Sequence, residues 1–352
     1  MSAEALKLVV HLGEGGRAGG RLAADALMDL VAAHGVASAV LLRGAEGYGG
    51  HHRLRTDRLL SLSDDLPLVL VAVDRATRIV ALADEAARLL PSGLLVLERV
   101  AMPGAQLDDD TLVRPGGEAK LTVYCARPRA PAVARELVAA GLAGAVALAG
   151  VDGVVLGRRH RARAISRNRD VPAFVMGIGS RHRVRDALAR VRGAAGRHVI
   201  TLERVTIVRR DGAPVGPLPV VPPEDEAGLG LWQRLIAVGG ETEGPGGRPF
   251  HVDLIRDLRA AGAPGATALR GVWAHTADGG GRAERLLSVR RRGPVLVTVI
   301  ARPAEMARLF AVVERATART GLVTCELLPA VRVSPAAGPP RGGLRLARTG
   351  VR

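Results

Sequence analysis

The sequence contains three diverged copies of one unit, and this internal repetition constrains the fold more than any other feature. Four anchors recur in the same order. They are a basic residue before a first strand (Lys7, Lys120, Arg234), a glycine ending a second apolar strand (Gly44, Gly150, Gly271), a proline before a third apolar run (Pro67, Pro172, Pro294) and a glutamate in a last strand (Glu98, Glu203, Glu326).

The spacing of the anchors supports the triplication. The glycine lies 37, 30 and 37 residues after the basic residue, the proline 23, 22 and 23 residues after the glycine, and the glutamate 31, 31 and 32 residues after the proline. Four ordered positions at matching distances indicate a repeated structural unit. The second copy has lost about seven residues after its first strand.

Each copy is predicted to fold as a ferredoxin-like βαββαβ unit, which makes the chain an α+β protein. Apolar residues at helical spacing predict a first helix at residues 21–34, 134–140 and 252–261. A similar pattern predicts a second helix near residues 76–90, 183–194 and 304–319. The sheet of such a unit has one face free of helices, which must be buried. We therefore expect the copies to close around one another as a single-chain pseudo-trimer, with independent domains joined like beads on a string as the alternative.

The predicted repeats span residues 5–102, 119–208 and 231–333. Between them, residues 103–118 and 209–230 are rich in Pro and Gly and carry acidic runs, so they read as linkers. Residues 334–352 read as a disordered basic tail, because Pro, Gly and Arg predominate there.

Composition limits the classes of function. The net charge of +16 suits an acidic partner, but arginine is abundant throughout the chain and compositional bias explains the charge as well. Aromatic residues make up only 2% of the chain, so base-stacking platforms for nucleic acid are not favoured. Cys125 and Cys325 have no neighbours at metal-ligand spacing, and no signal peptide or membrane span is evident. A cytoplasmic protein without a metal site is the expectation.

Copy one carries a specific set of motifs. It has Gly13-Glu14 after the first strand and Gly20 before the helix. Then come the run from Arg43 to Gly49, His52, the run from Arg55 to Ser61, and Asp65-Leu66-Pro67. On these residues the chain resembles the PII-like family known as domain of unknown function 190. Copy three keeps much of the pattern, whereas copy two is degenerate.

The resemblance implies a regulatory protein that binds a small effector, often an adenine nucleotide, in clefts between subunits. It also implies a loop between the second and third strands that contacts a transporter, an ion channel or an enzyme. Genes of the family often lie beside a fluoride channel gene, which makes such a channel a candidate partner. Neither an effector nor a target is established for the family.

The loop after the second strand holds most of the candidate ligand-binding residues. Glycines there permit close backbone approach, and arginine and histidine side chains offer charge-assisted hydrogen bonds to an anion. The candidates are Arg43, Gly44, Gly47, Tyr48, Gly49, His51, Arg55 and Arg58 in copy one, and Arg270, Gly271, Arg282 and Arg285 in copy three. The alternative is a solvated basic loop with turn glycines. The glycine-rich segment 13–21 is a second place where backbone amides could hold phosphate, or else a flexible loop.

The glutamates of the last strands need partners, because they lie in apolar runs. An arginine from an adjacent copy would supply one, so we interpret Glu98, Glu203 and Glu326 as interface residues. No catalytic arrangement stands out, and we expect the protein not to be an enzyme. The alternative to an effector-binding regulator is a basic structural or nucleic-acid-associated protein with no small-molecule effector.

Overall fold

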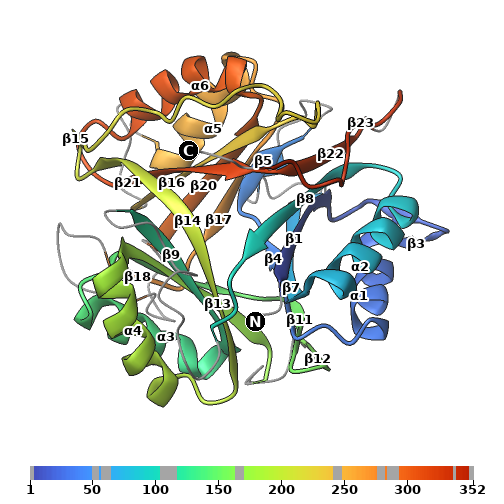
Figure 1. Cartoon of the computed structure of the whole chain (residues 1–352), viewed down its shortest axis with the longest axis horizontal. Helices are drawn as coiled ribbons and strands as arrows, with labels where there is room; N and C mark the ends of the chain where they lie inside the picture. The colour runs from blue at the N-terminus through green and yellow to red at the C-terminus, as the bar shows by residue number, and fades with distance from the viewer. Residues whose placement is uncertain are drawn as a thin grey trace.

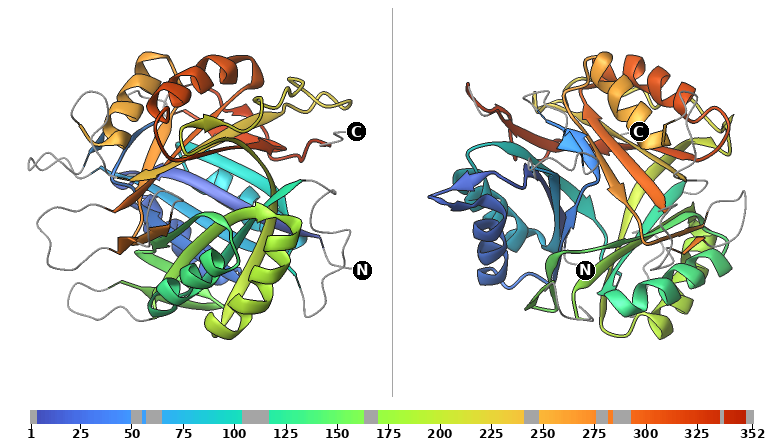
Figure 2. Two further views of the ribbon diagram at one scale, coloured as in Figure 1. Left: turned by 90° about the vertical axis from the view of Figure 1, so that its left-hand side faces the viewer. Right: turned by 180° about the vertical axis from the view of Figure 1, so that it is seen from behind.

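The computed structural model describes residues 4–49, 55–56, 65–103, 117–162, 170–240, 248–275, 282–283, 293–335 and 338–348. Within them the chain is a mixed α+β protein, as predicted. Three pairs of helices lie on the outside, and strands fill the space between them (Figures 1 and 2). No helix in this part of the chain is long and apolar enough to cross a membrane.

Repeat 1, residues 5–102, contains two helices packed on one side of a sheet. Its elements are β1 (Ala5–Gly13), β2 (Arg17–Ala18), β3 (Arg21–Leu22), α1 (Ala23–Ala33), β4 (Ser38–Arg43), β5 (Glu46–Tyr48), β6 (Arg55–Thr56), β7 (Pro67–Arg75), α2 (Ala76–Leu89) and β8 (Gly93–Val100).

Repeat 2, residues 119–208, follows the same order. Its elements are β9 (Glu118–Ala126), η2 (Arg127–Arg129), α3 (Ala130–Ala139), β10 (Ala143–Ala149), β11 (Asp152–Val155), β12 (Arg158–Arg161), β13 (Pro172–Ser180), α4 (Arg181–Ala194), β14 (His198–Arg210) and β15 (Ala213–Pro214). Strand β14 runs two residues past the predicted end of the repeat, because its last residues pair with a strand of repeat 3.

Repeat 3, residues 231–333, completes the set. Its elements are β16 (Trp232–Gly240), α5 (Phe250–Ala260), β17 (Ala266–Arg270), β18 (Trp273–His275), β19 (Arg282–Ala283), β20 (Pro294–Ala301), α6 (Pro303–Ala316), β21 (Leu322–Leu328) and β22 (Ala330–Ser334), and β23 (Arg341–Gly342) follows.

The main strands of each repeat have the antiparallel order of a ferredoxin-like unit. The orders are β8-β1-β7-β4, β14-β9-β13-β10 and β21-β16-β20-β17. Each first helix is followed by a glycine with positive φ, at Gly35, Gly141 and Gly262, a conformation that glycine adopts without strain. The first helix therefore ends in the same kind of turn in all three repeats.

Both faces of the central strands are buried. In β7, Leu68, Leu70 and Ala72 pack under the helices of repeat 1, whereas Val69 and Val71 face a core built by all three repeats. The alternation follows from the two-residue period of a strand. It explains why these strands read as continuous apolar runs in the sequence.

A short arm follows the second strand of each repeat and pairs with a neighbouring repeat. Strand β11 of repeat 2 pairs with β4 of repeat 1, β18 of repeat 3 with β10 of repeat 2, and β5 of repeat 1 with β17 of repeat 3. The three pairings follow one cyclic order, so every repeat both gives and receives an arm.

The C-terminal segment is ordered over residues 338–348, which corrects the prediction of a disordered tail. Strand β23 pairs with β22, and the Ala347 amide donates to the Pro329 carbonyl at 2.8 Å. Leu344 and Leu346 pack against the core of repeat 1. The segment is rich in Pro, Gly and Arg, so its composition predicted disorder. The few apolar residues in it and the strand edge of β22 are enough to hold it against the fold.

Candidate functional site

The predicted glycines of the arm lie in tight contacts between repeats. A Cβ on Gly47 would lie 2.7 Å from the Ala266 carbonyl oxygen of repeat 3. One on Gly44 would lie 2.6 Å from Pro67 Cγ of its own repeat and 3.1 Å from the Ala268 carbonyl oxygen of repeat 3. Gly271 is similar, with Pro294 Cγ of its own repeat at 2.7 Å and the Ala147 carbonyl oxygen of repeat 2 at 3.1 Å. The close backbone approach that these glycines permit is therefore an approach to a neighbouring strand.

The other candidate residues of the loop differ in how far they are exposed to solvent. Tyr48 is buried in the core of repeat 3, whereas Gly49 is exposed. Arg43 is 42% exposed, and its guanidinium donates to both carboxylate oxygens of Glu14, with Nη2 to Oε2 at 2.8 Å. Arg270 is half-buried at the end of β17.

The remaining predicted residues are placed only in part. Arg55 and Arg282 lie in β6 and β19, whose side chains are outside the described part of the structure. His51, Arg58 and Arg285 lie outside the described residues altogether. The structure therefore does not bring the predicted cationic set together as one observed site.

The glycine-rich segment 13–21 forms the small hairpin β2-β3. The Gly15 amide donates to Asp65 Oδ1 at 2.7 Å, so a carboxylate of the chain itself binds this amide.

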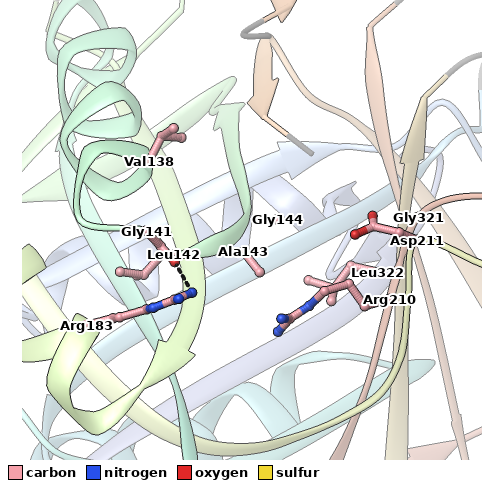
Figure 3. A pocket seen from close by; sticks show the side chains of 10 residues that line it. All are labelled: Val138, Gly141, Leu142, Ala143, Gly144, Arg183, Arg210, Asp211, Gly321 and Leu322. Carbon is pink, nitrogen blue, oxygen red and sulfur yellow. Dashed lines mark hydrogen bonds between the residues drawn. The ribbon is translucent and has the colours of Figure 1, made fainter. Parts of the chain in front are cut away.

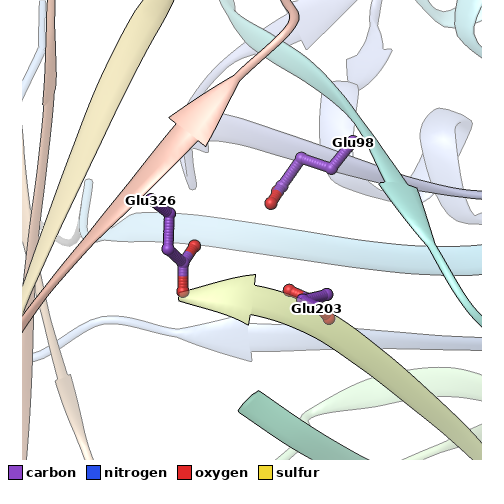
Figure 4. Close-up of side chains that lie close together, drawn as sticks. All are labelled: Glu98, Glu203 and Glu326. Carbon is purple, nitrogen blue, oxygen red and sulfur yellow. The ribbon is translucent and has the colours of Figure 1, made fainter. Parts of the chain in front are cut away.

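At the centre of the molecule, six buried charges form a closed ring, which we call the charge ring. It consists of Lys7, Glu98, Lys120, Glu203, Arg234 and Glu326. Each basic residue lies between the glutamate of its own repeat and the glutamate of a neighbour. The three glutamates point inward from β8, β14 and β21 (Figure 4).

The contacts of the ring are short. Lys7 Nζ lies 3.1 Å from Glu98 and also contacts Glu203, and Lys120 Nζ lies 2.7 Å from Glu203. Arg234 donates to both oxygens of Glu98 at 2.8 and 2.7 Å, and its Nε donates to Glu326 at 2.7 Å. The predicted interface role of the glutamates is thus confirmed, and an arginine of an adjacent repeat does pair with Glu98.

Pairing within the ring stabilises the ionised forms of Glu203 and Glu326. Burial alone would raise the pKa of Glu203, but attraction to Lys120 and Lys7 holds that pKa well below its usual range. Burial likewise opposes the low pKa of Glu326, which attraction to Arg234 and Lys120 produces.

The three carboxylates of the ring lie close enough together to hold a metal ion. However, three basic side chains already neutralise the three carboxylates. A cation bound there would have to displace buried lysine or arginine contacts, so we interpret the ring as a structural joint between repeats.

A cavity of about 220 Å³ lies where repeats 2 and 3 meet, and we call it the seam cavity (Figure 3). Its lining comes from the α3-β10 turn, the start of α4, the end of β14 and the start of β21. These residues are Val138, Gly141, Leu142, Ala143, Gly144, Arg183, Arg210, Asp211, Gly321 and Leu322.

Two arginines face each other across this cavity (Figure 3). The guanidinium of Arg183 donates to the Gly141 carbonyl at 2.8 Å, and Arg210 lies 3.8 Å from Glu118. The Nε of Arg210 is buried without a hydrogen-bond partner among the described residues. Asp211 adds one carboxylate to the lining, and it has a contact of its own. Two guanidinium groups with an apolar floor suit a small ligand that carries an oxyanion.

Arg183 and Arg210 are not among the ligand-binding residues predicted from the sequence. A comparison of equivalent positions in the three repeats could have identified Arg183. Arg183 corresponds to Arg78 of repeat 1, counted from the anchor prolines, but Asp74 of repeat 1 corresponds to Gly179. Asp74 binds Arg78 at 2.7 Å. Repeat 2 therefore keeps the arginine and has lost its carboxylate partner.

Comparisons with known proteins agree with the repeat structure. The model of the family described as "Uncharacterized ACR, COG1993", or DUF190, matches residues 5–102, 121–207 and 233–330. Among solved structures, aspartate kinase from Synechocystis matches at 11% identity with a TM-score of 0.24, over 94% of this chain and 45% of that chain. A chlorite dismutase mutant from Candidatus Nitrospira defluvii, in complex with cyanide, matches at 8% identity with a TM-score of 0.18, over 63% of this chain and 95% of that chain. The chain thus spans less than half the length of the aspartate kinase, and similarity this low carries no argument about function.

Proposed function

Because the chain belongs to the DUF190 family, whose activity is uncharacterised, we propose a function from the geometry: a PII-like regulator that binds a small anionic effector between repeats. The observation that carries the proposal is the seam cavity, with Arg183 and Arg210 on its two sides. An anion between them would be held by β14 and α4 at the junction with repeat 3. An adenine nucleotide is one candidate effector, and the role is binding rather than catalysis.

We further propose that the chain is a single-chain pseudo-trimer. The cyclic exchange of arms, the core shared by all three repeats and the charge ring support this arrangement. Each of these contacts buries the open face or the strand edge of one repeat against another. Light scattering should give the mass of one chain, and a trimer of chains with repeats paired between them would contradict the arrangement.

The position of the cavity suggests how an effector would be sensed. The cavity is lined by Ala143 and Gly144 at the start of β10, and the next residue of that strand, Ala145, pairs with His275 of the repeat 3 arm. An anion bound beside this strand end would stabilise the seam and the base of the arm together. The loop that the arm begins is the part expected to contact a target, such as a transporter, an ion channel or an enzyme.

Isothermal titration tests the proposal with ATP, AMP and inorganic phosphate as probes. We expect at least one of them to bind, and the double variant Arg183→Gln/Arg210→Gln to lose that binding. Arg190→Gln is the matched control, since Arg190 lies on the same helix and pairs weakly with Glu136 at 3.6 Å. Binding of none of the three, or equal binding by the double variant, would contradict the proposal.

A parallel titration with duplex DNA separates this function from the alternative of a nucleic-acid-associated protein. Binding to phosphates by scattered arginines would fall steeply with salt and would survive loss of the two cavity arginines. Effector binding in the cavity would not survive it.

A further inference from the structure

The three repeats differ at the position that Asp74 occupies in repeat 1. In repeat 1, Asp74 is almost fully buried at the end of β7, with 6% of its side chain exposed. Its Oδ2 accepts hydrogen bonds from the Ala37 amide and from Arg78 Nη1, both at 2.7 Å, and its Oδ1 accepts one from the Arg75 amide at 2.6 Å. Asp74 is therefore an oxyanion held by one guanidinium and two backbone amides.

Repeat 2 keeps the arginine of this arrangement and has no carboxylate at the position of Asp74. Counted from the anchors, Arg183 corresponds to Arg78 and Ala143 to Ala37, although a register shift after Ala143 moves its place in the sheet. Both residues line the seam cavity. Gly179 stands where repeat 1 has Asp74, and a Cβ on Gly179 would lie 3.2 Å from Leu142. Leu142 thus covers Gly179 as an apolar floor, and the Arg183 guanidinium stays accessible from the cavity.

Repeat 3 has neither the carboxylate of Asp74 nor the guanidinium of Arg78 at the equivalent positions. Ala301 corresponds to Asp74, and Glu305 corresponds to Arg78. The Glu305 side chain accepts a hydrogen bond from the Arg302 amide at 3.3 Å and caps its own helix. Arg210 also has no basic counterpart in repeat 3, because the equivalent residue counted from the anchor glutamate is Val333.

We infer that the chain binds one oxyanion, at the seam between repeats 2 and 3, and that Asp74 is a covalently attached substitute for that ligand in repeat 1. The inference rests on the proposed function and narrows it. A homotrimer offers identical clefts, whereas here repeat 1 supplies its own anion, repeat 2 requires one from solution and repeat 3 repels one. The ligand class is a small carboxylate or a phosphate monoester, since Asp74 shows that a carboxylate satisfies the surroundings.

The first test is stoichiometry on the intact chain. Isothermal titration with inorganic phosphate, with succinate and with AMP separates the two ligand chemistries, and the ligand that binds should saturate at one per chain. Saturation at two or three per chain would overturn this inference and leave the proposed function standing. If neither these ligands nor ATP binds, both this inference and the proposed function are wrong.

The second test exchanges the residues of repeats 1 and 2 at one position, Asp74 and Gly179. Gly179→Asp should abolish binding at the seam cavity, because the new carboxylate would pair with Arg183. Asp74→Gly should make the thermal stability of the chain depend on added formate or acetate, which would replace the lost carboxylate beside Arg78. We expect the melting temperature of this variant to rise with acetate concentration by several degrees more than that of the parent chain.

Two outcomes would contradict the role of Asp74. One is an equal response of parent and Asp74→Gly to acetate at constant ionic strength. The other is unchanged binding stoichiometry and affinity in a folded Gly179→Asp variant. If Asp74→Gly does not fold, Asp74→Ala supplies the same comparison, since it also removes the carboxylate and leaves room for acetate beside Arg78.

Discussion

The charge ring and the seam cavity both place basic side chains where repeats meet, but under opposite conditions. In the ring, Lys7, Lys120 and Arg234 are buried and every one of them lies between two carboxylates. In the cavity, Arg183 and Arg210 lie near the surface and face each other. Buried charges require full pairing within the fold, whereas solvent hydrates cations near the surface that have few protein partners. The ring is therefore suited to holding the repeats together, and the cavity is suited to binding.

Removing one charge from the ring should have the largest effect. Glu203→Gln leaves Lys7 and Lys120 with one carboxylate fewer in a buried place, and we expect a loss of about 3–5 kcal/mol in the free energy of unfolding. Urea denaturation measures it. The matched cavity variant, Arg183→Gln, should change stability by no more than ~0.5 kcal/mol.

A double variant distinguishes an unpaired charge from a lost interaction. Lys120→Met combined with Glu326→Leu removes one positive and one negative charge, and it should be much less destabilising than Glu203→Gln. Equal losses in the single and double variants would show that the ring matters through its packing alone.

Acid should weaken the charge ring. The pKa of Glu203 and that of Glu326 are lower in the folded chain than in the unfolded chain. The stability they contribute is thus present above the ordinary glutamate pKa of about 4.3 and is lost as pH falls through the folded values. Urea unfolding at a series of pH values should show this loss, and Glu203→Gln should reduce its slope. An unchanged slope in the variant would exclude Glu203 as its source.

The arms offer a third kind of junction, in which backbone lies against backbone. A Cβ on Gly153 would lie 2.3 Å from both the Ala39 carbonyl oxygen and Pro172 Cγ. We expect Gly153→Ala to cost about 1–3 kcal/mol in thermal or urea unfolding. Gly49→Ala is the control, because nothing lies within 4 Å of its Cβ position. A neutral Gly153→Ala would mean that the arm yields easily and contributes little to the junction.

The sequence predicted the repeats, the α+β class and the interface glutamates, because each depends on local periodicity or on a charge within an apolar run. Glu98, Glu203 and Glu326 could be recognised as needing partners without any coordinates. Their full set of partners required the third dimension, since Lys7 and Lys120 each contact a glutamate of another repeat across the shared core.

The candidate site was harder to predict, because the most specific sequence motif, the glycine-rich loop after the second strand, contributes to packing between repeats. Gly44 and Gly47 were expected to admit a ligand, and they admit a neighbouring strand instead. Arg183 gave no signal among the many arginines of the chain. The pairing of Asp74 with Arg78 in repeat 1 shows that Gly179 deprives Arg183 of the carboxylate that its counterpart has.

The smallest expected effect tests why repeat 3 begins with arginine where the others begin with lysine. Arg234 makes two hydrogen bonds to Glu98 and two to Glu326, through Nε and Nη2, which a planar guanidinium can do at once. A lysine there keeps the charge but offers one nitrogen, so Arg234→Lys should cost about 1 kcal/mol, the net value of a lost hydrogen bond. Urea denaturation measures this cost, and Lys120→Arg is the reciprocal variant. If Arg234→Lys were as damaging as Glu203→Gln, the geometry of the ring rather than its charge balance would hold the repeats together. A loss near 1 kcal/mol would instead show that charge balance dominates and that the arginine adds only its extra contacts.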